Sequence, residues 1–541
     1  MKQRLINLTK KDIIVIGGGI IGAGIAREAR LRGLSVALFE KGDFASGTSS
    51  KTSCLIHGGI RYLEQGEFRL VYEAIQERFI LSRLAPHLVT PLSFLFPIYQ
   101  GGRKAITIRI GMMLYDLFAG SKSFGRHRFF SKDATLKLEP NLSPNGLLGA
   151  AQFWDCQMDD ARLCLSTLLS AEADGAEIFR DTQVIDLIQN NGEITGVRVK
   201  EIGTGDEYCI QGAVIINATG SWTDTVRRLE TNRHAERVNN VRPTKGIHIV
   251  LSKLTDHAIV LSNTDKGDPA SGHIFFVIPW QGFSLIGTTD TDYYGSLDRV
   301  LPVKEEIESL LSETAPFLPS IRKTKALACF AGLRPLINSH EKNPWEMSRR
   351  ERIEWTDGGM LQVYGGKFTL FRKIAIRVID TVIKQHPTWK RLRWRPDPEP
   401  PIHGGAIDRS DALKVLHPPN TPGEGVISAT ISAETASHLI GAYGTYYQAV
   451  IDCAEGDADL LKPLTPLGYP LLAEVIYTVR HEHARHLSDF MLRRTRLAHG
   501  PYRASIPLIE AIANKMGSEL QWGPEAIRQE YEAYRVEIGI A

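Results

Sequence analysis

The sequence predicts an α/β domain that is interrupted by an inserted mixed-sheet α+β domain and followed by an all-α C-terminal domain. Three observations support this fold class. A β-branched segment over 12–16 runs into a glycine-rich turn and then into a helical pattern. Strand-like segments recur between 91 and 152 and between 241 and 327, and helical periodicity dominates after 405.

The composition is that of a folded globular protein. Of the 541 residues, 43% are hydrophobic and 23% are charged, which suits a chain of two or three domains. The 64 basic and 61 acidic side chains leave a formal net charge of +3, so we expect no nucleic-acid partner. Six cysteines without a CxxC pair predict neither a metal site nor a disulfide framework.

The opening segment carries the glycine spacing of a Rossmann-like dinucleotide-binding domain. Gly17, Gly19 and Gly22 lie between the strand expected over 12–16 and the helix that follows. Gly17 allows a tight turn, Gly19 lets a pyrophosphate approach the backbone, and Gly22 lets helix and strand pack closely. Glu40 ends the next expected strand, where a carboxylate accepts hydrogen bonds from ribose hydroxyls. A purely structural glycine-rich turn is the alternative.

A second strand-to-glycine-to-helix element spans 360–369 and contains Gly365, Gly366 and Lys367. The helix that follows would present about half a positive charge at its N-terminus, which stabilises the negative charge on a reduced flavin. One dinucleotide fingerprint together with this element favours tightly held FAD over an exchanging nicotinamide. An ordinary turn is the alternative interpretation of the element.

The domains are expected to be discontinuous along the chain. The buried strand over 213–217 ends in the small-residue turn from Ala218 to Gly220 and is expected to return to the first sheet, and the proline-rich stretch over 395–401 predicts a linker. We expect an FAD-binding domain over 1–90, 150–240 and 330–390, a substrate-binding domain over 91–149 and 241–329, a linker over 391–404, and a helical domain over 405–541 with helices over 433–440, 446–454, 470–486 and 504–516.

Motifs are spread over most of the chain, at 17–22, 43–50, 55–63, 159–163, 245–248, 286–290, 332–336, 364–367 and 493–497. Through these motifs the chain resembles the FAD-dependent sn-glycerol-3-phosphate dehydrogenases. The stretches IHGGIRYL over 56–63 and GLRPL over 332–336 are specific to that resemblance. The glycine fingerprint alone is shared by many flavoproteins.

The resemblance implies a flavoenzyme that oxidises sn-glycerol 3-phosphate to dihydroxyacetone phosphate, with hydride transfer to FAD and electron transfer to membrane quinone. It also implies cofactor-binding roles for a set of residues around both glycine turns, namely Gly17, Gly19, Gly22, Glu40, Thr48, Ser49, Ser50, Ala218, Gly220, Gly365, Gly366 and Lys367.

Three arginines match substrate-contacting positions of the family: Arg61, Arg334 and Arg349. A phosphate dianion suits such residues because a guanidinium donates two parallel hydrogen bonds. A structural, ion-paired arginine is the alternative for each, and Arg349 lies in the least specific motif.

Alcohol oxidation also needs a base for the hydroxyl proton. His57 and His248 are the candidates because both lie beside glycines in matched motifs, and His57 is favoured. Lys367, at a helix start, is expected to hold the substrate phosphate or hydroxyl and to polarise the flavin as it is reduced. Tyr62 is a further expected donor to substrate, with packing beside Arg61 as the alternative.

The chain departs from the family pattern near this expected site. Cys54 replaces a lysine found in many relatives, so a cationic contact from that position is not expected. Leu370 and Phe371 replace a more hydroxyl-rich run, so a hydrogen bond near the flavin is lost.

The segment over 103–118 mixes basic and apolar side chains, and Lys122, Arg126 and Arg128 follow it. This pattern is typical of an interfacial helix on anionic lipid. An amphipathic helix on the protein's own core is the alternative. Since we find no secretory signal and no bilayer-spanning run, we expect a cytoplasmic chain that associates peripherally with the cytoplasmic membrane.

Near the C-terminus, Asp489 and the arginines Arg493, Arg494 and Arg496 fall on consecutive turns and predict an ion-paired helix face rather than a site. The helical domain that carries them is also a candidate surface for a homodimer.

Three other functions compete with the favoured one. An oxidase of the same fold would pass electrons to oxygen, and an amine or amino-acid oxidase would carry a carboxylate clamp in place of the motifs around Arg61 and Arg334. A flavin-bound sensor without catalysis is the third. Turnover of a polyol phosphate would separate the sensor from the enzymes.

Overall fold

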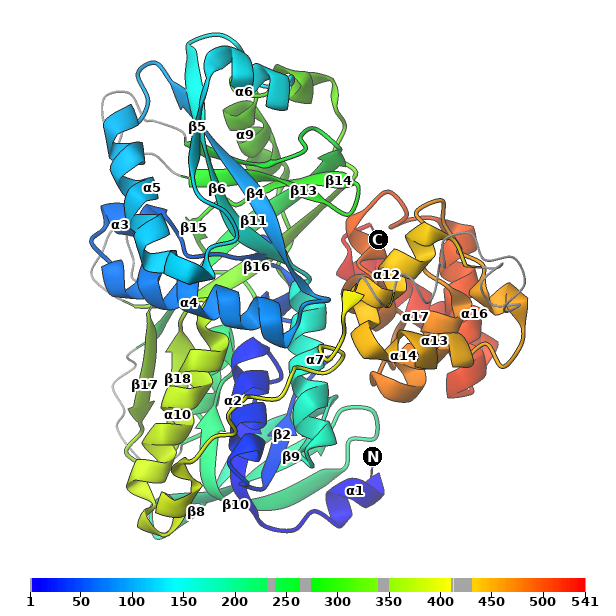
Figure 1. Ribbon diagram of the computed structural model, residues 1–541. Helices are drawn as coiled ribbons and strands as arrows, with labels where there is room; N and C mark the ends of the chain where they lie inside the picture. Colours follow the sequence, from blue (N-terminus) through cyan, green and yellow to red (C-terminus); the bar gives the residue numbers. More distant parts are fainter. Residues whose placement is uncertain are drawn as a thin grey trace.

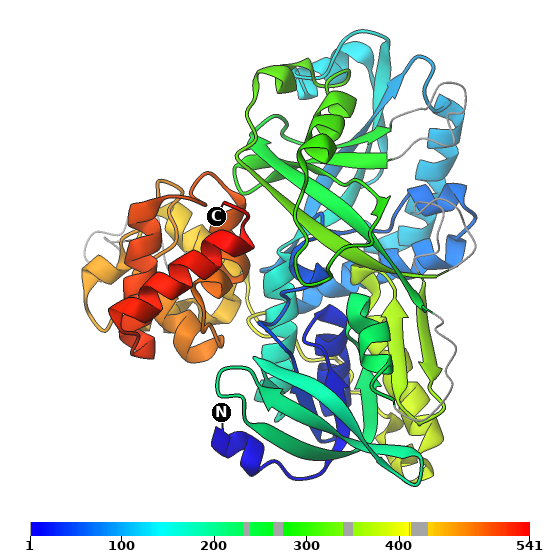
Figure 2. The same cartoon turned by 180° about the vertical axis from the view of Figure 1, so that it is seen from behind.

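The computed structural model describes residues 2–230, 239–262, 274–338, 350–409, 412 and 431–540. Two sheets follow one another along the long axis of the molecule, and a helical C-terminal part lies beside their junction (Figure 1). The view from behind shows the same three parts, with the C-terminal helices against the side of the molecule (Figure 2).

The first sheet has a parallel centre in the order β18, β10, β1, β2 and β7. The core strands β1 and β2 are almost continuously apolar because both faces of the sheet are covered. Helices α2, α7 and α10 cover one face, and the antiparallel strands β8 and β9, together with the N-terminal half of β10 that pairs with β9, lie on the other. The elements are β1 (Lys11–Ile16), α2 (Ile20–Leu31), β2 (Val36–Phe39), α7 (Asp160–Ala173), β7 (Glu177–Phe179), β8 (Thr182–Asn190), β9 (Glu193–Glu201), β10 (Glu207–Asn217), β17 (Glu351–Trp355), β18 (Leu361–Gly365) and α10 (Phe371–Gln385).

The second sheet is mixed, since β12 pairs with β4 in parallel and the other ladders are antiparallel. Helices α4 and α5 cover one face of this sheet, and α9 covers the other. Its elements are β3 (Leu55–Ile56), α4 (Phe68–Leu84), β4 (Val89–Tyr99), α5 (Ala105–Ala119), β5 (Arg128–Ser131), α6 (Lys132–Leu138), β6 (Leu147–Met158), β11 (Val241–Ser252), β12 (Ala258–Ser262), β13 (Ile274–Trp280), β14 (Phe283–Gly287), β15 (Thr291–Asp292), α9 (Lys304–Thr314) and β16 (Ala328–Ile337).

The C-terminal part is helical. The helix expected over 470–486 is shorter, because the buried Glu482 ends it and His483 adopts a left-handed backbone with φ of 56°. A π-helical turn over Phe490–Arg494 follows. The helices are α12 (Ala433–Tyr443), α13 (Tyr447–Asp452), α14 (Leu472–His481), α15 (Leu487–Asp489), α16 (Ile506–Leu520) and α17 (Pro524–Glu537).

The proline-rich stretch over 395–401 is anchored along the first sheet's helices. Arg27 of α2 donates to the Glu399 carboxylate at 2.6 Å and to the Pro400 carbonyl at 2.5 Å, and Arg395 reaches the Glu28 carboxylate at 2.7 Å. The connection to the C-terminal part therefore follows a defined path.

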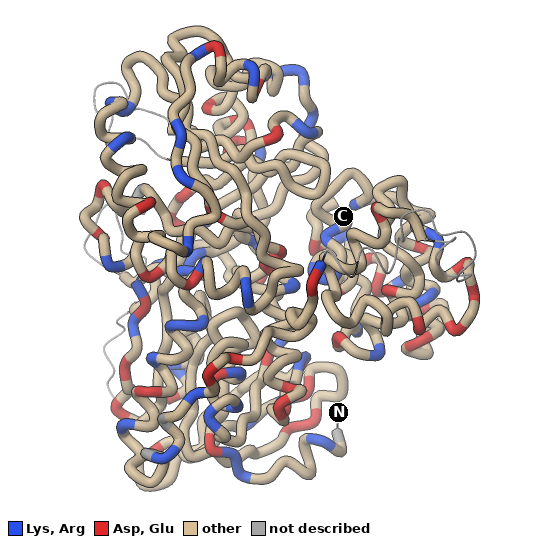
Figure 3. Tube along the Cα trace, in the orientation of Figure 1, with Lys and Arg blue, Asp and Glu red and all other residues tan. Residues whose placement is uncertain are grey.

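Charged residues of both signs are interspersed over all three parts of the described chain (Figure 3).

Candidate functional site

A cavity of about 550 Å³ lies where the two sheets meet. Elements from both sheets line it, together with the loop between β2 and β3. Fourteen residues predicted from the sequence are among its lining: Gly17, Gly19, Glu40, Thr48, Ser49, His57, Tyr62, Ala218, Gly220, His248, Arg334, Gly365, Gly366 and Lys367.

The first glycine turn is shaped by close backbone approach. Gly17 has φ of 108°, and a Cβ there would lie 2.9 Å from the Ala218 carbonyl oxygen. A Cβ on Gly22 would lie 2.0 Å from the Gly17 carbonyl oxygen. Gly22 does not line the cavity, and it acts by letting α2 begin directly behind the turn. The N-terminus of α2 is thus held against the cavity wall.

Two polar side chains face this helix start. Ser49 accepts a hydrogen bond from the Ile20 amide at 2.9 Å. The Glu40 carboxylate accepts from the Gly18 amide at 2.7 Å and from the Gly42 amide at 2.9 Å. Burial raises the pKa of Glu40, although these two amides act in the opposite direction. Glu40 therefore lines the cavity in a fixed orientation, at the end of β2.

The second glycine turn enters the cavity from β18. Gly365 and Gly366 have φ of 74° and 83°, conformations that favour glycine. Lys367 follows and precedes a short 3₁₀ turn that leads into α10. Its Nζ donates to the His57 carbonyl at 2.8 Å and lies 5.2 Å from the centre of the Tyr62 ring. Lys367 thereby joins the second glycine turn to the 57–62 segment.

The two histidines have different surroundings. His57 is half-buried and lies edge-on to Phe276, with ring centroids 6.3 Å apart. His248 is buried, with Nε2 at 2.9 Å from the Ser53 hydroxyl and the ring stacked on Phe330. Burial, with a smaller effect of Arg334, lowers the pKa of His248 to about 3. His248 is therefore neutral at physiological pH.

Of the three predicted arginines, Arg334 is placed at the cavity. Its guanidinium donates to Asp290 at 3.0 Å, to the Thr288 hydroxyl at 2.7 Å and to the Thr289 carbonyl at 3.0 Å. The backbone of Arg61 begins the short helix α3 (Arg61–Glu64), but its side chain lies outside the described part of the chain, as does all of Arg349.

Four other predicted positions lie behind the cavity lining. Ser50 is buried, and its carbonyl faces the C-terminal part rather than the cavity. Cys54 has a left-handed backbone with φ of 55°, and burial raises the pKa of its thiol to about 12. Leu370 and Phe371 are buried, and Phe371 packs against Gly24 of α2.

No sequence pattern predicts the buried polar set that lies behind the 57–59 loop. Asp155 of β6 lines the cavity and accepts from Tyr115 of α5 at 2.6 Å and from Arg78 of α4 at 2.6 Å. The Gly58 amide donates to the Tyr115 hydroxyl at 2.9 Å and to Asp155 at 3.2 Å. These three side chains come from separate elements without a common spacing, so only the fold brings them together.

The cavity fits FAD on the evidence of its own residues. A Cβ on Gly19 would come within 3.1 Å of the Ser49 hydroxyl, so glycine keeps the helix start open to a pyrophosphate. Glu40 offers a carboxylate to ribose hydroxyls, and the turn from Gly365 to Lys367 faces the same space from the opposite side. A dinucleotide held between these turns would lie in the cavity that residues of the second sheet also line.

Comparison with known proteins agrees with this geometry. Residues 12–349 match the family model described as FAD dependent oxidoreductase, and residues 400–527 match the C-terminal domain of alpha-glycerophosphate oxidase. Glycerol-3-phosphate dehydrogenase 2 from Mycobacterium tuberculosis is 33% identical, with 97% of this chain and 88% of the relative covered. Aerobic glycerol-3-phosphate dehydrogenase from Bacillus subtilis is 34% identical, with 97% and 94% covered.

A solved structure has the same architecture throughout. The glycerol-3-phosphate dehydrogenase from Bacillus halodurans complexed with FAD superposes with a TM-score of 0.79 at 27% identity, covering 100% of this chain and 97% of that one. The predicted fold class and the predicted FAD cofactor are confirmed by these matches. The chain belongs to the FAD-dependent glycerol-3-phosphate dehydrogenases, a family of FAD-dependent oxidoreductases.

Proposed function

We propose that this flavoenzyme oxidises sn-glycerol 3-phosphate to dihydroxyacetone phosphate and delivers the electrons to membrane quinone. The observation that carries the proposal is one cavity in which two glycine turns, a lysine, two histidines and an arginine converge. FAD supplies the hydride acceptor when it is bound there. The names of the relatives support glycerol 3-phosphate as substrate.

In this proposal, the glycine turns and Glu40 hold the dinucleotide, and the residues of the second sheet hold the substrate. His57 takes the hydroxyl proton, since it is half-buried at the cavity. His248, whose pKa is lowered to about 3, is a weaker base and orients a substrate oxygen from its place beside Ser53. Lys367, at the second glycine turn, would stabilise the negative charge that develops on a bound flavin when it is reduced.

The substrate phosphate is assigned to arginines. Arg334 contacts Asp290 and two threonines, which fix the direction of its guanidinium. A pre-oriented guanidinium loses less entropy when it binds an oxyanion. We propose that Arg61 and Arg349 complete the phosphate site and that Tyr62 donates to a substrate oxygen.

The proposed route to quinone starts at α5. One face of this helix is buried, but Ile106, Ile110, Met113 and Leu117 on another face are 61%, 54%, 63% and 72% exposed. We call these four residues the α5 stripe. The exposed basic residues Lys104, Arg109, Arg126 and Arg128 lie on or near the same helix.

An apolar stripe beside basic side chains suits the surface of anionic lipid. Arg103, also part of the predicted segment, is instead buried and paired with Glu64 at 2.9 Å. No helix in the described part of the chain is long and apolar enough to cross a bilayer. We therefore propose peripheral attachment through the α5 stripe.

The substrate assignment is tested by anaerobic titration of the purified holoenzyme with sn-glycerol 3-phosphate, following the absorbance of oxidised flavin. Glycerol, glycine and sarcosine are the controls. We expect the phosphate ester alone to bleach the flavin. Bleaching by an amine, or none by the ester, would contradict the assignment.

The acceptor is tested separately with the reduced enzyme. A quinone analogue should reoxidise it faster than dissolved oxygen at the same concentration, and little peroxide should form. Faster reoxidation by oxygen, with one peroxide per substrate, would instead favour the oxidase alternative.

A further inference from the structure

The loop between β2 and β3 makes much of the cavity wall but has little regular structure of its own. Residues 46–49 and 51–53 line the cavity. The Ser49 hydroxyl accepts a hydrogen bond from the first amide of α2, and the Thr48 hydroxyl donates one to the Leu333 carbonyl on the second sheet. We call residues 43–53 the cofactor loop. Its position fixes the helix start that faces the pyrophosphate.

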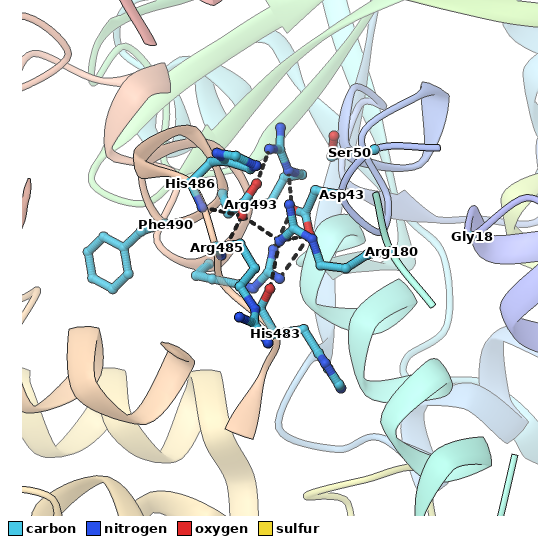
Figure 4. A network of polar contacts seen from close by, with 12 residues as sticks. Gly18, Asp43, Ser50, Arg180, His483, Arg485, His486, Phe490 and Arg493 are labelled. Carbon is cyan, nitrogen blue, oxygen red and sulfur yellow. Dashed lines mark hydrogen bonds and ion pairs between the residues drawn. The ribbon is translucent and has the colours of Figure 1, made fainter. Parts of the chain in front are cut away.

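One end of the cofactor loop is held by arginines from the C-terminal part. Asp43 is 1% exposed as a side chain and accepts from Arg494 at 2.6 Å and from Arg493 at 2.5 Å. Arg180, at the end of β7, adds a third contact at 3.2 Å. Figure 4 shows Asp43 between Arg180, which follows β7 of the first sheet, and Arg493 of the C-terminal part. Although burial acts in the opposite direction, these guanidinium groups hold the pKa of Asp43 below its usual range.

The other end is held by Arg496. Its Nη1 donates to the Ser50 carbonyl at 2.5 Å, and its Nη2 is ion-paired with Asp160. Asp160 in turn accepts from the Thr52 amide at 2.9 Å and from the Thr52 hydroxyl at 2.7 Å. One guanidinium therefore fixes the loop at residue 50 directly and at residue 52 through a carboxylate.

The local backbone of the C-terminal part is adapted to these contacts. Arg493 and Arg494 lie in the π-helical turn that follows α15, and Arg496 has a left-handed backbone with φ of 62°. π-Helical turns and left-handed non-glycine residues carry a conformational cost and are retained where surrounding contacts over-determine them. All three arginine side chains are buried, and they point out of the C-terminal part toward residues 43–53.

We propose that Arg493, Arg494 and Arg496, here called the arginine clamp, are positioning residues for FAD. They set the cofactor loop from the C-terminal domain and touch neither substrate nor the reacting atoms. This inference rests on the proposed placement of FAD against residues 46–49. It gives the C-terminal domain a role in cofactor retention that neither its helices nor the glycine fingerprint would indicate.

The chain offers a matched control. Arg162 of α7 is as buried as Arg496 and crosses the same domain junction, donating to Glu482 at 2.6 Å and to the Ala442 carbonyl at 2.7 Å. It also donates to the backbone carbonyl of Arg494 at 3.3 Å, but in the described part of the chain it makes no hydrogen bond or ion pair with residues 43–53. Arg162→Gln and Arg496→Gln therefore remove the same charge from the same interface, and only the second frees the cofactor loop.

The test measures FAD release from holoenzyme on dilution, followed by the fluorescence of free FAD. We expect Arg496→Gln to raise the Kd for FAD at least tenfold, Arg496→Lys to raise it about threefold, and Arg162→Gln to leave it within twofold. Amide hydrogen exchange in peptides covering 46–53 should accelerate in the first variant and not in the control. If Arg496→Gln does not fold, Arg496→Lys carries the comparison.

Equal effects of the Arg162 and Arg496 substitutions on FAD affinity would overturn the proposal, because the interface would then act only through general stability. An unchanged Kd in Arg496→Gln would overturn it as well. FAD release needs no substrate, so a failed titration with sn-glycerol 3-phosphate would refute the proposed reaction without affecting this result.

Discussion

The buried polar set behind the 57–59 loop predicts that removing one hydroxyl group from it strongly lowers the free energy of unfolding. Tyr115→Phe keeps the aromatic ring but deletes the hydroxyl that donates to both Asp155 oxygens, at 2.6 and 2.8 Å, and accepts from Gly58 at 2.9 Å. Burial, helped by Asp155, raises the pKa of Tyr115 well above its usual range, so the phenol keeps its proton and donates. Arg78 remains as the charged partner of Asp155.

The magnitude follows from the kind of hydrogen bond lost. A hydrogen bond to a buried charged group contributes about 1.5–3 kcal/mol, and the Gly58 amide also loses its shorter acceptor. We therefore expect Tyr115→Phe to lower the free energy of unfolding by about 2–3 kcal/mol. Tyr99→Phe is the matched control, because the Tyr99 hydroxyl donates to the neutral Ser143 carbonyl at 3.0 Å, worth about 1 kcal/mol.

The assay is urea unfolding of both variants with excess FAD, compared through the denaturation midpoint at constant slope. If Tyr115→Phe costs no more than Tyr99→Phe, then Asp155 does not depend on the phenol and the reasoning is wrong. A change in slope for Tyr115→Phe alone would mean that the native state itself has loosened.

Three further predictions concern the turn, the membrane and pH. Gly22→Ala should retain less than a tenth of the FAD of wild type, measured by absorbance, because its Cβ would lie 2.0 Å from the Gly17 carbonyl. Met113→Glu should abolish sedimentation with anionic liposomes at low salt, whereas Ile506→Glu, at an exposed position outside the α5 stripe, should not. Burial is the main cause that lowers the pKa values of His87 and His248 to about 3. Below about pH 6.5 the unfolded state binds a proton at each histidine and the folded state does not, so each histidine lowers the free energy of unfolding by about 2 kcal/mol between pH 7 and pH 5. Urea midpoints across that range should show this loss of stability, and the loss should be less steep in His87→Gln.

The parts of the site that depend on local sterics could be predicted from the sequence. Gly17, Gly22 and Gly366 occupy positions where backbone or side-chain atoms leave no room for a Cβ, and such positions leave a readable glycine spacing. Lys367 was expected at the cavity because it follows the second turn directly. Proximity along the chain carried each of these inferences.

Contacts between distant segments could not be predicted. The sequence predicts that the arginines near the C-terminus form an ion-paired helix face, and Asp489 is one of their partners in the structure. Their side chains are buried, however, and Arg493 and Arg494 also pair with Asp43, about 450 positions away. Helical spacing describes neighbours on one helix, and it contains no information about a carboxylate on another domain.

The buried set around Asp155 and the arginine clamp have the same effect: each fixes a loop of the cavity wall. Glycine-rich segments lose more conformational entropy on folding than others, and they have few side chains with which to hold a fixed shape. A Cβ on Gly58 would lie 2.4 Å from the Tyr115 hydroxyl, so the loop beside His57 needs glycine there and is fixed from behind by Asp155. The cofactor loop is likewise fixed from behind by the arginine clamp. Ion pairs between separate elements therefore supply the rigidity that the glycine-containing walls of the cavity lack.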